Sequence, residues 1–438
     1  MFCNQCEQSF RGVGCSNTPG VCGKDEDVQS LQEIILYGLK GMAAYAHHAR
    51  RLGKTDESVS AFIEEALFST MTNVNFDLGS LFDIAMELGR KNLRVMEMLD
   101  AGHVETFGKP SPTVVTEGTK AGPGILITGH DLVDLADLLK QCEGTNVKVY
   151  THGEMLPAHM YPKLRNHPNL GGHYGGAWQE QKDEFAKFTG PVIATTNCIV
   201  IPKATYADRV FTTRVTAVPG GVRLKDNNFA PVIAKALKCA PLQEKIVRTS
   251  TIGFHRQVIL DAAPTIVQAV KEGKISRFFV IGGCDGAEPG RNYFSDYAQA
   301  TPKDSFILTL GCGKYRIRDY NYGEHLGLPR LMDMGQCNDA YGAIAVAVAL
   351  AGAFKCGVND LPLTLVISWF EQKAVAVLLT LLSLDVLLTL LSLGVKNITI
   401  GPNPPAFVTP NVFKILQDKF ALRLSGDAKA DLAAVLKK

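Results

Sequence analysis

The N-terminal part of the chain carries its apolar residues at the spacing of amphipathic helices. Between residues 27 and 52 they recur every three or four positions, at Leu31, Ile35, Leu39 and Met42. This is the period of one face of a helix, and two more helical patterns follow at about residues 57–70 and 78–100. Three helices with short connections predict a small helical bundle.

From about residue 122 the pattern changes to short apolar runs that alternate with helical stretches. The runs include GILITG, VKVYTHG, PVIATTN, FFVIGG, FILTLG, LTLVISWF and NITIG. Near-continuous apolar strands separated by helices are typical of parallel sheets that are covered on both faces. The segment 105–124, rich in Pro, Gly and Thr, is interpreted as a linker or domain boundary, and residues 240–251 are polar. We therefore predict a multi-domain α/β protein with a cysteine loop and three-helix bundle at 1–115 and two doubly wound, Rossmann-like parallel-sheet domains at 116–240 and 241–438.

One segment is apolar enough to be taken for a membrane span. Residues 374–395 read AVAVLLTLLSLDVLLTLLSLGV, with a single charge, and such a length can cross a bilayer as a helix. The segment contains a tandem repeat of nine residues, 378–386 and 387–395, so a continuous helix would be apolar on all sides. It has no flanking aromatic and basic anchors and leads into the predicted strand NITIG. We therefore predict a buried core segment and no association with a membrane.

The composition is that of a globular chain and excludes several other classes. Of the 438 residues, 46% are hydrophobic and 20% are charged, and the formal net charge is +2. No basic surface for nucleic acid is therefore expected. The N-terminus lacks the basic and apolar regions of a signal peptide, which favours a cytoplasmic location. Eleven cysteines in such a compartment are more typical of metal binding or redox chemistry than of disulfides.

Potential metal ligands follow directly after seven of the predicted strands. They are His130, Glu154, Cys198, Cys284, Cys312, Cys337 and Glu371. In open α/β sheets the carboxyl ends of the strands border the ligand crevice, so all seven converge on one site if the two domains face each other. Four thiolates, one imidazole and two carboxylates mix soft and hard donors, and the cysteines are not paired as in structural zinc sites. The set favours a polynuclear iron site with sulfur and oxygen ligands, to which glycines beside three of the cysteines would allow close backbone approach.

A second group of cysteines lies at the N-terminus. Cys3, Cys6, Cys15 and Cys22 form the pattern C-x₂-C-x₈-C-x₆-C. Four thiolates in one loop hold a [2Fe–2S] cluster, a [4Fe–4S] cluster or zinc, and the spacing alone does not decide between iron and zinc. A second, redox-suited site in the same chain shifts the interpretation to iron–sulfur, with one cluster relaying electrons and the other holding the substrate.

Long motifs in nearly the whole chain carry a resemblance to a known family. The motifs are MFCNQCEQ, TGHDL, VYTHGEMLPAH, TTNCIVIPK, GGCDGAEPGRNYF, LGCGKYR, MGQCNDAYGA, SWFEQKAVAVLLTLL and GPNPPAFVTPNV. With them the sequence closely resembles the hybrid cluster proteins, also named prismane proteins or hydroxylamine reductases.

The resemblance implies two clusters and a set of catalytic residues. The seven strand-end residues would hold a hybrid 4Fe–2S–2O cluster, and the N-terminal cysteines a [4Fe–4S] cluster, because the short loop is similar to that version in the family. Cys284 would match the cysteine that the family carries as a persulfide, and Lys373 matches a family lysine near the cluster. The residues expected to take part in catalysis are Glu154, Glu371, Lys373, Cys284 and His130.

The resemblance also implies an activity. The chain is expected to be an oxidoreductase of an anaerobic cell that reduces hydroxylamine to ammonia and water, or nitric oxide to nitrous oxide. A ferredoxin, a rubredoxin or a flavin reductase would supply its electrons. One alternative is a nitric-oxide sensor or a protein that nitrosylates cysteines of its partners. Another is an activity like that of carbon monoxide dehydrogenase, although two carboxylate ligands favour iron with oxygen over nickel with sulfide.

Two departures from the family pattern bear on these expectations. Only about 20 residues join Asp100 to Gly122, where larger members carry a second helical bundle. The chain therefore resembles the short, class III subgroup, and one flank of the crevice would be more open. The repeat at 378–395 is similar to a duplication absent from the family. It begins after Lys373, so the ligands should be kept while the local packing changes.

Other groups that could carry chemistry have ordinary explanations. Three further cysteines lie in or beside helical patterns and are expected to be buried thiols, namely Cys142, Cys239 and Cys356. His152 and His159 stand as in the H-x-E motif of zinc deaminases, but the P-C-x-x-C partner of that motif is missing. Tyr293 is expected to pack in the core rather than to line a pocket. The stretch GGCDGAEPG lacks the Lys-Ser/Thr of a phosphate-binding loop.

Overall fold

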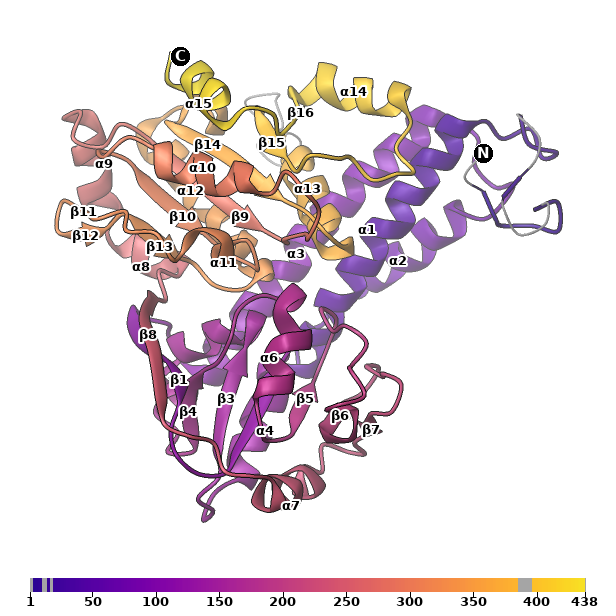
Figure 1. The fold of residues 1–438 in the computed structure, drawn as a ribbon. Helices are drawn as coiled ribbons and strands as arrows, with labels where there is room; N and C mark the ends of the chain where they lie inside the picture. Colours follow the sequence, from indigo (N-terminus) through magenta and orange to yellow (C-terminus); the bar gives the residue numbers. More distant parts are fainter. Residues whose placement is uncertain (1–2, 10–13, 16–18, 385–395, 438) are drawn as a thin grey trace.

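A computed structural model describes residues 3–9, 14–15, 19–384 and 396–437 of the chain (Figure 1). A helical bundle lies beside one half of a large twisted sheet, the half that contains β9 (Phe278–Gly283) and β10 (Phe306–Thr309). The other half, which contains β2 (Gly124–Thr128) and β3 (Lys148–His152), lies below both in the view of Figure 1. In the described part of the chain this sheet has 14 strands, and helices cover both of its faces. The mixed α/β class predicted from the sequence is confirmed.

The N-terminal bundle consists of α1 (Glu26–Arg51), α2 (Glu57–Ser69) and α3 (Leu78–Phe107). Each helix begins after an aspartate whose side chain accepts a hydrogen bond from a backbone N–H of the first turn, and these caps are Asp25, Asp56 and Asp77. All three predicted helices are present. The third is longer than predicted, because its apolar face continues to Phe107.

One half of the sheet follows the bundle and is parallel. In space its strands run in the order β4 (Leu170–His173), β3 (Lys148–His152), β2 (Gly124–Thr128), β5 (Val192–Ala194), β6 (Val210–Thr212) and β7 (Val222–Arg223). The connecting helices are α4 (Leu132–Gln141), α5 (Pro162–Arg165), α6 (Gln181–Lys187) and α7 (Ala230–Lys238). The four central strands β3, β2, β5 and β6 are short and almost fully buried, as parallel pairing between two layers of helices requires, whereas the edge strand β7 is exposed.

The other half of the sheet is parallel as well. Its strands run in the order β16 (Arg423–Leu424), β15 (Ile398–Ile400), β14 (Leu363–Ser368), β9 (Phe278–Gly283), β10 (Phe306–Thr309) and β13 (Leu331–Asp333). Its helices are α8 (Arg256–Asp261), α9 (Ala263–Lys271), α10 (Asn292–Ala300), α11 (Lys314–Ile317), α12 (Ala340–Phe354), α13 (Gln372–Ser383), α14 (Pro410–Phe420) and α15 (Ala428–Leu436). A separate hairpin is formed by β11 (Glu324–His325) and β12 (Leu328–Pro329).

An antiparallel pair of strands joins the two halves. It consists of β1 (Thr113–Thr119) and β8 (Lys245–Ile252), which lie in the segments interpreted from the sequence as a linker and a polar stretch. Residues 113–119 of the predicted linker or boundary segment form a strand, and β8 was not predicted because it faces solvent along most of its length and shows no continuous apolar run. Its stability comes from backbone pairing, which the side-chain pattern does not reveal. The predicted boundary at residue 115 falls inside β1, and both domain boundaries remain predictions.

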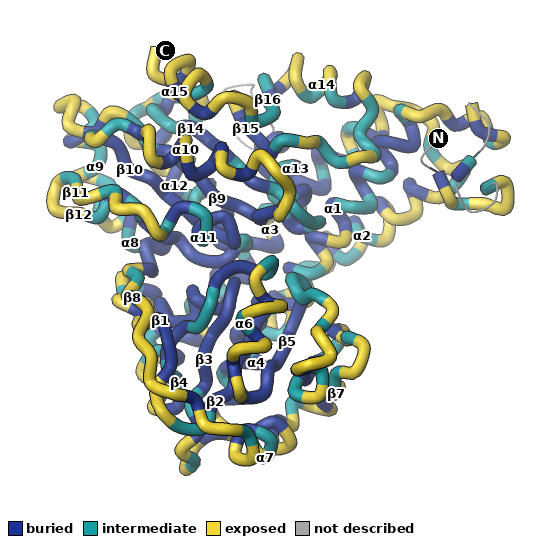
Figure 2. The backbone as a smooth tube through the Cα atoms, in the orientation of Figure 1, coloured by how far each residue is buried: buried dark blue, intermediate teal, exposed yellow. Residues whose placement is uncertain are grey.

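The apolar helix α13 is buried between α1 and α3, as predicted for the start of segment 374–395 (Figures 1 and 2). Residues 385–395, which include the second copy of the repeat, lie outside the described residues. In the described chain one helical stretch, Cys337–Phe354, has the length and composition of a membrane span, and 56% of it is buried against the rest of the protein. A buried core helix passes the same test, so this stretch is weak evidence for a span.

Candidate metal centre

All seven predicted strand-end ligands lie at the carboxyl ends of parallel strands. His130 follows β2, Glu154 lies in a 3₁₀ helix after β3, and Cys198 follows β5. On the other half of the sheet, Cys284 follows β9, Cys312 follows β10, Cys337 follows β13 and Glu371 follows β14. These residues are called the crevice site below. Because parallel strands end at the same edge of a sheet, each half presents its members at one edge.

Three of these residues meet directly across the two halves of the sheet. The Nε2 atom of His130 lies 3.8 Å from Oε2 of Glu154, and the same oxygen accepts a hydrogen bond of 2.8 Å from the backbone N–H of Cys337. One potential ligand atom of each residue lies within 4.8 Å of the other two. The two halves of the sheet therefore face each other at this point, as the sequence required for a shared site.

The remaining members of the crevice site are linked to these by electrostatics. Burial, followed by the charges of Glu371, Cys198 and Cys337, raises the pKa of Cys284 well above its ordinary value. A hydrogen bond with Cys198, followed by burial, raises the pKa of Cys312. Each of these acids is close enough to the others to disfavour their ionised forms. The four thiols and two carboxyls of the prediction thus interact in one cluster, in which Cys284, Cys312 and Glu154 are buried and Cys198, Cys337 and Glu371 are partly buried.

Such a cluster fits a cation at its centre. Burial raises the pKa of Glu154 and of Glu371, and burial lowers the pKa of His130 well below its ordinary value, which leaves a neutral imidazole able to bind a metal. Oε1 of Glu154 is buried and has no hydrogen-bond partner. A bound metal reverses the pKa shift of its acidic ligands, because they must be deprotonated to bind it. Sulfur, nitrogen and oxygen donors together fit a mixed iron site.

Two glycines allow the loops that carry Cys284 and Cys312, in the second half of the sheet, to approach each other closely. Gly283 and Gly311 precede Cys284 and Cys312 and have φ angles of 104° and 70°, which side chains rarely adopt. A Cβ atom on Gly311 would lie 2.6 Å from the carbonyl oxygen of Gly283. The predicted close approach is therefore between the cysteine loops themselves. This close approach of the loops holds the thiols of Cys284 and Cys312 at the ends of the neighbouring strands β9 and β10.

Cys198 is held in a conformation that is unusual for a residue with a side chain. Its φ angle is 67°, which costs about 1 kcal/mol or more. Gln181 at the start of α6 stabilises the turn: its Nε2 donates to the carbonyl oxygen of Cys198 at 2.6 Å, and its Oε1 accepts from the N–H of Val200 at 3.1 Å. A backbone strained and clamped in this way is typical of functional sites.

An apolar cavity of about 60 Å³ reaches the crevice site at Cys284 and Cys337. Its walls include Tyr45 of the bundle and small residues of α12. A second apolar cavity, of about 220 Å³, shares part of its lining, including Ala343 and Ala347, with the first. The crevice site therefore borders apolar space on one side.

Comparison with known proteins identifies the family of the chain. A profile described as the prismane/CO dehydrogenase family matches residues 1–83 and 77–433. The chain belongs to this family. It is 56% identical over 436 residues, the full length of both proteins, to a hydroxylamine reductase of Moorella thermoacetica. It is 53% identical over 425 residues to a hydroxylamine reductase of Rhodospirillum rubrum, which covers 97% of this chain and 76% of that protein.

Solved structures place the fold in the same group. Carbon monoxide dehydrogenase IV from Carboxydothermus hydrogenoformans superposes with a TM-score of 0.79 at 16% identity, over 99% of this chain and 91% of that one. A nickel-free carbon monoxide dehydrogenase from Thermococcus sp. AM4 gives a TM-score of 0.77, over 99% of this chain and 90% of that one. At this identity the likeness concerns the fold alone.

In this prismane-family chain the N-terminal cysteines lie in a small loop at the far end of α1 (Figure 1). The N–H of Cys15 donates to the carbonyl oxygen of Cys3 at 2.8 Å. Cys3 is buried, whereas Cys6 is exposed. In the described residues, no three of these thiols lie within 4.8 Å of one another, so the cluster type remains a prediction. Because a helix rises about 1.5 Å per residue, about 30 Å of α1 separate this loop from Tyr45 at the crevice site.

Several residues around the crevice site were missed by the sequence analysis. Lys373, which was predicted, is buried and donates to Oδ1 of Asn197 at 2.7 Å, and Asn197 itself was not singled out. Gln336 donates from Nε2 to the carbonyl oxygens of His130 (3.1 Å) and Glu154 (2.6 Å), and so ties the two halves of the sheet together. Its signals in the sequence were its position next to Cys337 and its place in the motif MGQCNDAYGA.

The remaining predictions concern residues outside the site. The hydroxyl of Tyr293 donates to Asp431 at 2.9 Å, so this tyrosine packs between α10 and α15 as expected. Cys142 is buried, and burial raises its pKa to about 12, which makes it an inert thiol. His152 donates to or accepts from Thr128 (3.1 Å) and Glu184 (2.8 Å) and has ordinary partners on both ring nitrogens.

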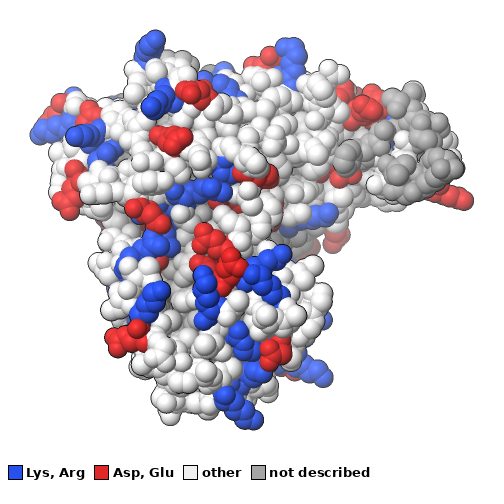
Figure 3. Space-filling model, viewed as in Figure 1, with Lys and Arg blue, Asp and Glu red and all other residues white. Residues whose placement is uncertain are grey.

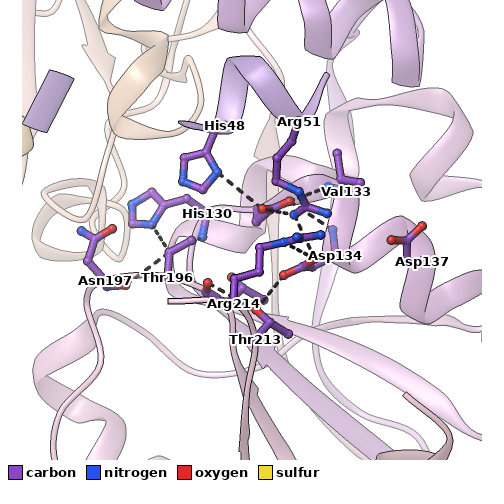
Figure 4. A network of polar contacts seen from close by, with 12 residues as sticks. His48, Arg51, His130, Val133, Asp134, Asp137, Thr196, Asn197, Thr213 and Arg214 are labelled. Carbon is purple, nitrogen blue, oxygen red and sulfur yellow. Dashed lines mark hydrogen bonds and ion pairs between the residues drawn. The ribbon is translucent and has the colours of Figure 1, made fainter. Parts of the chain in front are cut away.

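A buried charge network supports the His130 side of the site (Figure 4). Arg51 at the end of α1 pairs with both Asp131 and Asp134 of the first sheet half, and Nδ1 of His48 lies 3.5 Å from Asp131. Burial alone would raise the pKa of Asp131, but His48 and Arg51 hold it well below its ordinary value. Asp131 also caps α4 directly after His130. The network thus fixes the bundle against the strand end that carries a candidate ligand.

Replacing Arg51 with methionine is expected to destabilise the fold. The change leaves two carboxylates, 3% and 0% exposed, without the cation that they share, while His48 stays 3.5 Å from Asp131 and Arg214 stays 3.5 Å from Asp134. Breaking a buried ion pair from one side costs about 3–5 kcal/mol, and urea denaturation followed by circular dichroism measures it. Arg94→Met is the matched control, because Arg94 is half exposed in its ion pairs and its loss should cost about 1 kcal/mol or less. Equal effects of the two variants would contradict a structural role for the buried network.

Proposed function

We propose that the chain is an iron–sulfur oxidoreductase that reduces hydroxylamine at a hybrid 4Fe–2S–2O cluster held by the crevice site. The observation that carries this proposal is the convergence of four thiols, one neutral imidazole and two carboxyls from both halves of the sheet, with one buried oxygen of Glu154 left without a partner. The names of the full-length relatives give the substrate. The reaction takes up two electrons and two protons: NH₂OH + 2 e⁻ + 2 H⁺ → NH₃ + H₂O.

When bound, the cluster would supply electrons and a Lewis-acidic iron with room for a small ligand. The protein residues would exclude water from the site and supply protons. Glu154, Cys284 and Cys312 are buried, so the pocket excludes bulk water. Burial raises the pKa of the Glu154 and Glu371 carboxyls, so either group could hold a proton for the reaction when it is released from the metal. Lys373 places a buried ammonium group at the same site.

The apolar cavity at Cys284 and Cys337 favours nitric oxide as a second substrate. A small uncharged gas enters apolar space that a polar molecule avoids. Its reduction follows 2 NO + 2 e⁻ + 2 H⁺ → N₂O + H₂O. A sensor or a protein that nitrosylates cysteines of partners would bind nitric oxide stoichiometrically without steady consumption of reductant. Steady turnover with a supplied reductant therefore distinguishes an enzyme from either of these.

Metal analysis and electron paramagnetic resonance test the proposal. Protein purified without oxygen should contain about eight irons per chain for two four-iron clusters, with acid-labile sulfide and no nickel, and should show two distinct paramagnetic centres. It should convert hydroxylamine to ammonia with a reduced electron donor. Nickel in the crevice site would instead support an activity like that of carbon monoxide dehydrogenase. Zinc in the N-terminal loop, or about four irons in total, would contradict the assignment of one of the two sites.

Serine in place of Cys6 is expected to remove the N-terminal cluster alone. The loop and the crevice site lie at opposite ends of α1, so about half of the iron and the resonance of the crevice cluster should remain. Turnover driven by a protein electron donor such as a ferredoxin should be lost, because the exposed end of this loop is the proposed entry point for electrons. Cys239→Ser, at a half-buried cysteine outside both sites, is the control. Loss of both clusters in Cys6→Ser would contradict two independent sites.

A further inference from the structure

Helix α1 brings a tyrosine hydroxyl to one of the crevice cysteines. The Oη–H of Tyr45 donates to Sγ of Cys337 at 3.3 Å, a normal length for a hydrogen bond to sulfur. Tyr45 is 1% exposed, so no water competes for this contact. Neither the strand-end pattern nor the motifs of the sequence pointed to Tyr45.

The approach of α1 depends on a glycine one turn before Tyr45. A Cβ atom on Gly41 would lie 2.5 Å from the carbonyl oxygen of Gln372 and 2.9 Å from the Cα atom of Lys373. Any larger residue at this position would push α1 away from the first turn of α13. Since Tyr45 lies on the same face of α1 one turn later, the glycine sets how close the hydroxyl comes to the sulfur.

The ring of Tyr45 is fixed by a neighbouring cation. Nζ of Lys373 lies 5.4 Å from the centroid of the ring and donates to Oδ1 of Asn197 at 2.7 Å. The amide of Asn197 in turn donates to Sγ of Cys198, at a longer 3.4 Å. In the described part of the protein, two side chains other than cysteines donate to sulfurs of the crevice site, namely Tyr45 and Asn197. Lys373 contacts both of them. Of the two donors, Tyr45 comes from a separate element and makes the shorter contact.

We propose that Tyr45 is a positioning residue that sets the reduction potential of the crevice cluster through its hydrogen bond to Cys337. This inference rests on the proposed function, because it requires a redox-active cluster at the crevice site. A hydrogen bond to a ligand sulfur stabilises negative charge on it. The reduced cluster carries one more negative charge than the oxidised one, so the bond favours reduction and makes the potential less negative. The cation of Lys373 next to the ring acts in the same direction.

The substitution Tyr45→Phe tests this inference, because it removes the hydroxyl and keeps the ring under Lys373. At a fixed potential the ratio of reduced to oxidised crevice cluster should fall about tenfold, as expected for one hydrogen bond to a charged group. For a one-electron couple this corresponds to a midpoint about 59 mV more negative. Titration of the reduction potential, followed by electron paramagnetic resonance, measures it. The N-terminal cluster of the same sample should keep its midpoint and serves as an internal reference.

A second tyrosine provides the matched control. Tyr297 is also 1% exposed, and its hydroxyl has no hydrogen-bond partner, so Tyr297→Phe should leave both midpoints unchanged. A Tyr45→Phe protein with full iron and an unchanged crevice midpoint would overturn the inference. Loss of crevice iron in this variant would overturn it too, because the hydroxyl would then be needed for assembly. Failure of the proposed function is a separate result, seen in the unmodified protein as missing crevice iron or absent hydroxylamine turnover.

Discussion

Serine in place of Cys312 is expected to abolish hydroxylamine turnover by removing the crevice cluster. Cys312 is 3% exposed and interacts electrostatically with Cys198, Glu154 and Cys284, so its position is closed to bulk water. A hydroxyl oxygen is a poor ligand for iron that prefers soft thiolates at this position. The iron content should fall from about eight to about four per chain, the amount that the N-terminal cluster holds.

The control for this experiment is a cysteine that is as buried but outside the site. Cys142 lies at the end of α4, is 0% exposed and belongs to the apolar core of the first sheet half. Cys142→Ala should keep both clusters and full turnover, although the small cavity it leaves costs some stability. If Cys312→Ser kept eight irons and the resonance of both centres, Cys312 would not be a ligand. If it lost all iron, the two clusters would not assemble independently.

The candidate ligands could be named from the sequence because each follows a strand that is visible as an apolar run. The runs before His130, Cys198 and Cys284 are buried on both faces, and such strands leave the clearest pattern in a sequence. The rule that parallel strands end at a common edge then gave the convergence. The distance between the two halves of the sheet was not available in this way. It depends on the antiparallel pair β1 and β8. The mostly exposed side chains of β8 and the mixed burial of β1 give no such pattern.

Residues that support the ligands were missed for a different reason. Tyr45 lies on a helix that reads as an ordinary amphipathic helix of the bundle, and only the packing of α1 on α13 brings it to Cys337. Lys314 is buried and donates to both oxygens of Asp333 and to the carbonyl oxygen of Gly335, and although it lies in the motif LGCGKYR, the sequence did not indicate these contacts. Contacts of this kind join segments far apart in the chain. A periodic pattern within one segment cannot predict them.

These supporting contacts show that the crevice site is assembled from three parts of the chain. The bundle contributes Tyr45 and Arg51, the first sheet half contributes His130 and Glu154, and the second contributes Cys337. Each part holds the next through hydrogen bonds and ion pairs, and these contacts orient the donors of the site. Preorganisation of this kind fixes the geometry of a metal site.

Replacing Glu154 with glutamine is expected to reduce hydroxylamine turnover at least about 100-fold, within the range for removing a group that ligates metal or transfers a proton. The amide oxygen of glutamine can still accept the 2.8 Å hydrogen bond from the N–H of Cys337 that Oε2 accepts in the native protein. The amide nitrogen then takes the place of Oε1, which is buried and without a partner. An amide nitrogen has no lone pair for a metal and no proton to give at neutral pH. The variant therefore removes one function and keeps the local fold.

The assay compares turnover with iron content and with the resonance of the crevice cluster in the same preparation. Glu143→Gln is the matched control, because Glu143 is exposed and its carboxylate pairs with His167, which lies outside the crevice site. Full iron with an altered crevice resonance and slow turnover would identify Glu154 as a ligand that is needed for the reaction and not for assembly. Full iron, an unchanged resonance and slow turnover would identify it as a proton donor. Unchanged turnover would remove Glu154 from the mechanism, and its unpartnered oxygen would then need a different explanation.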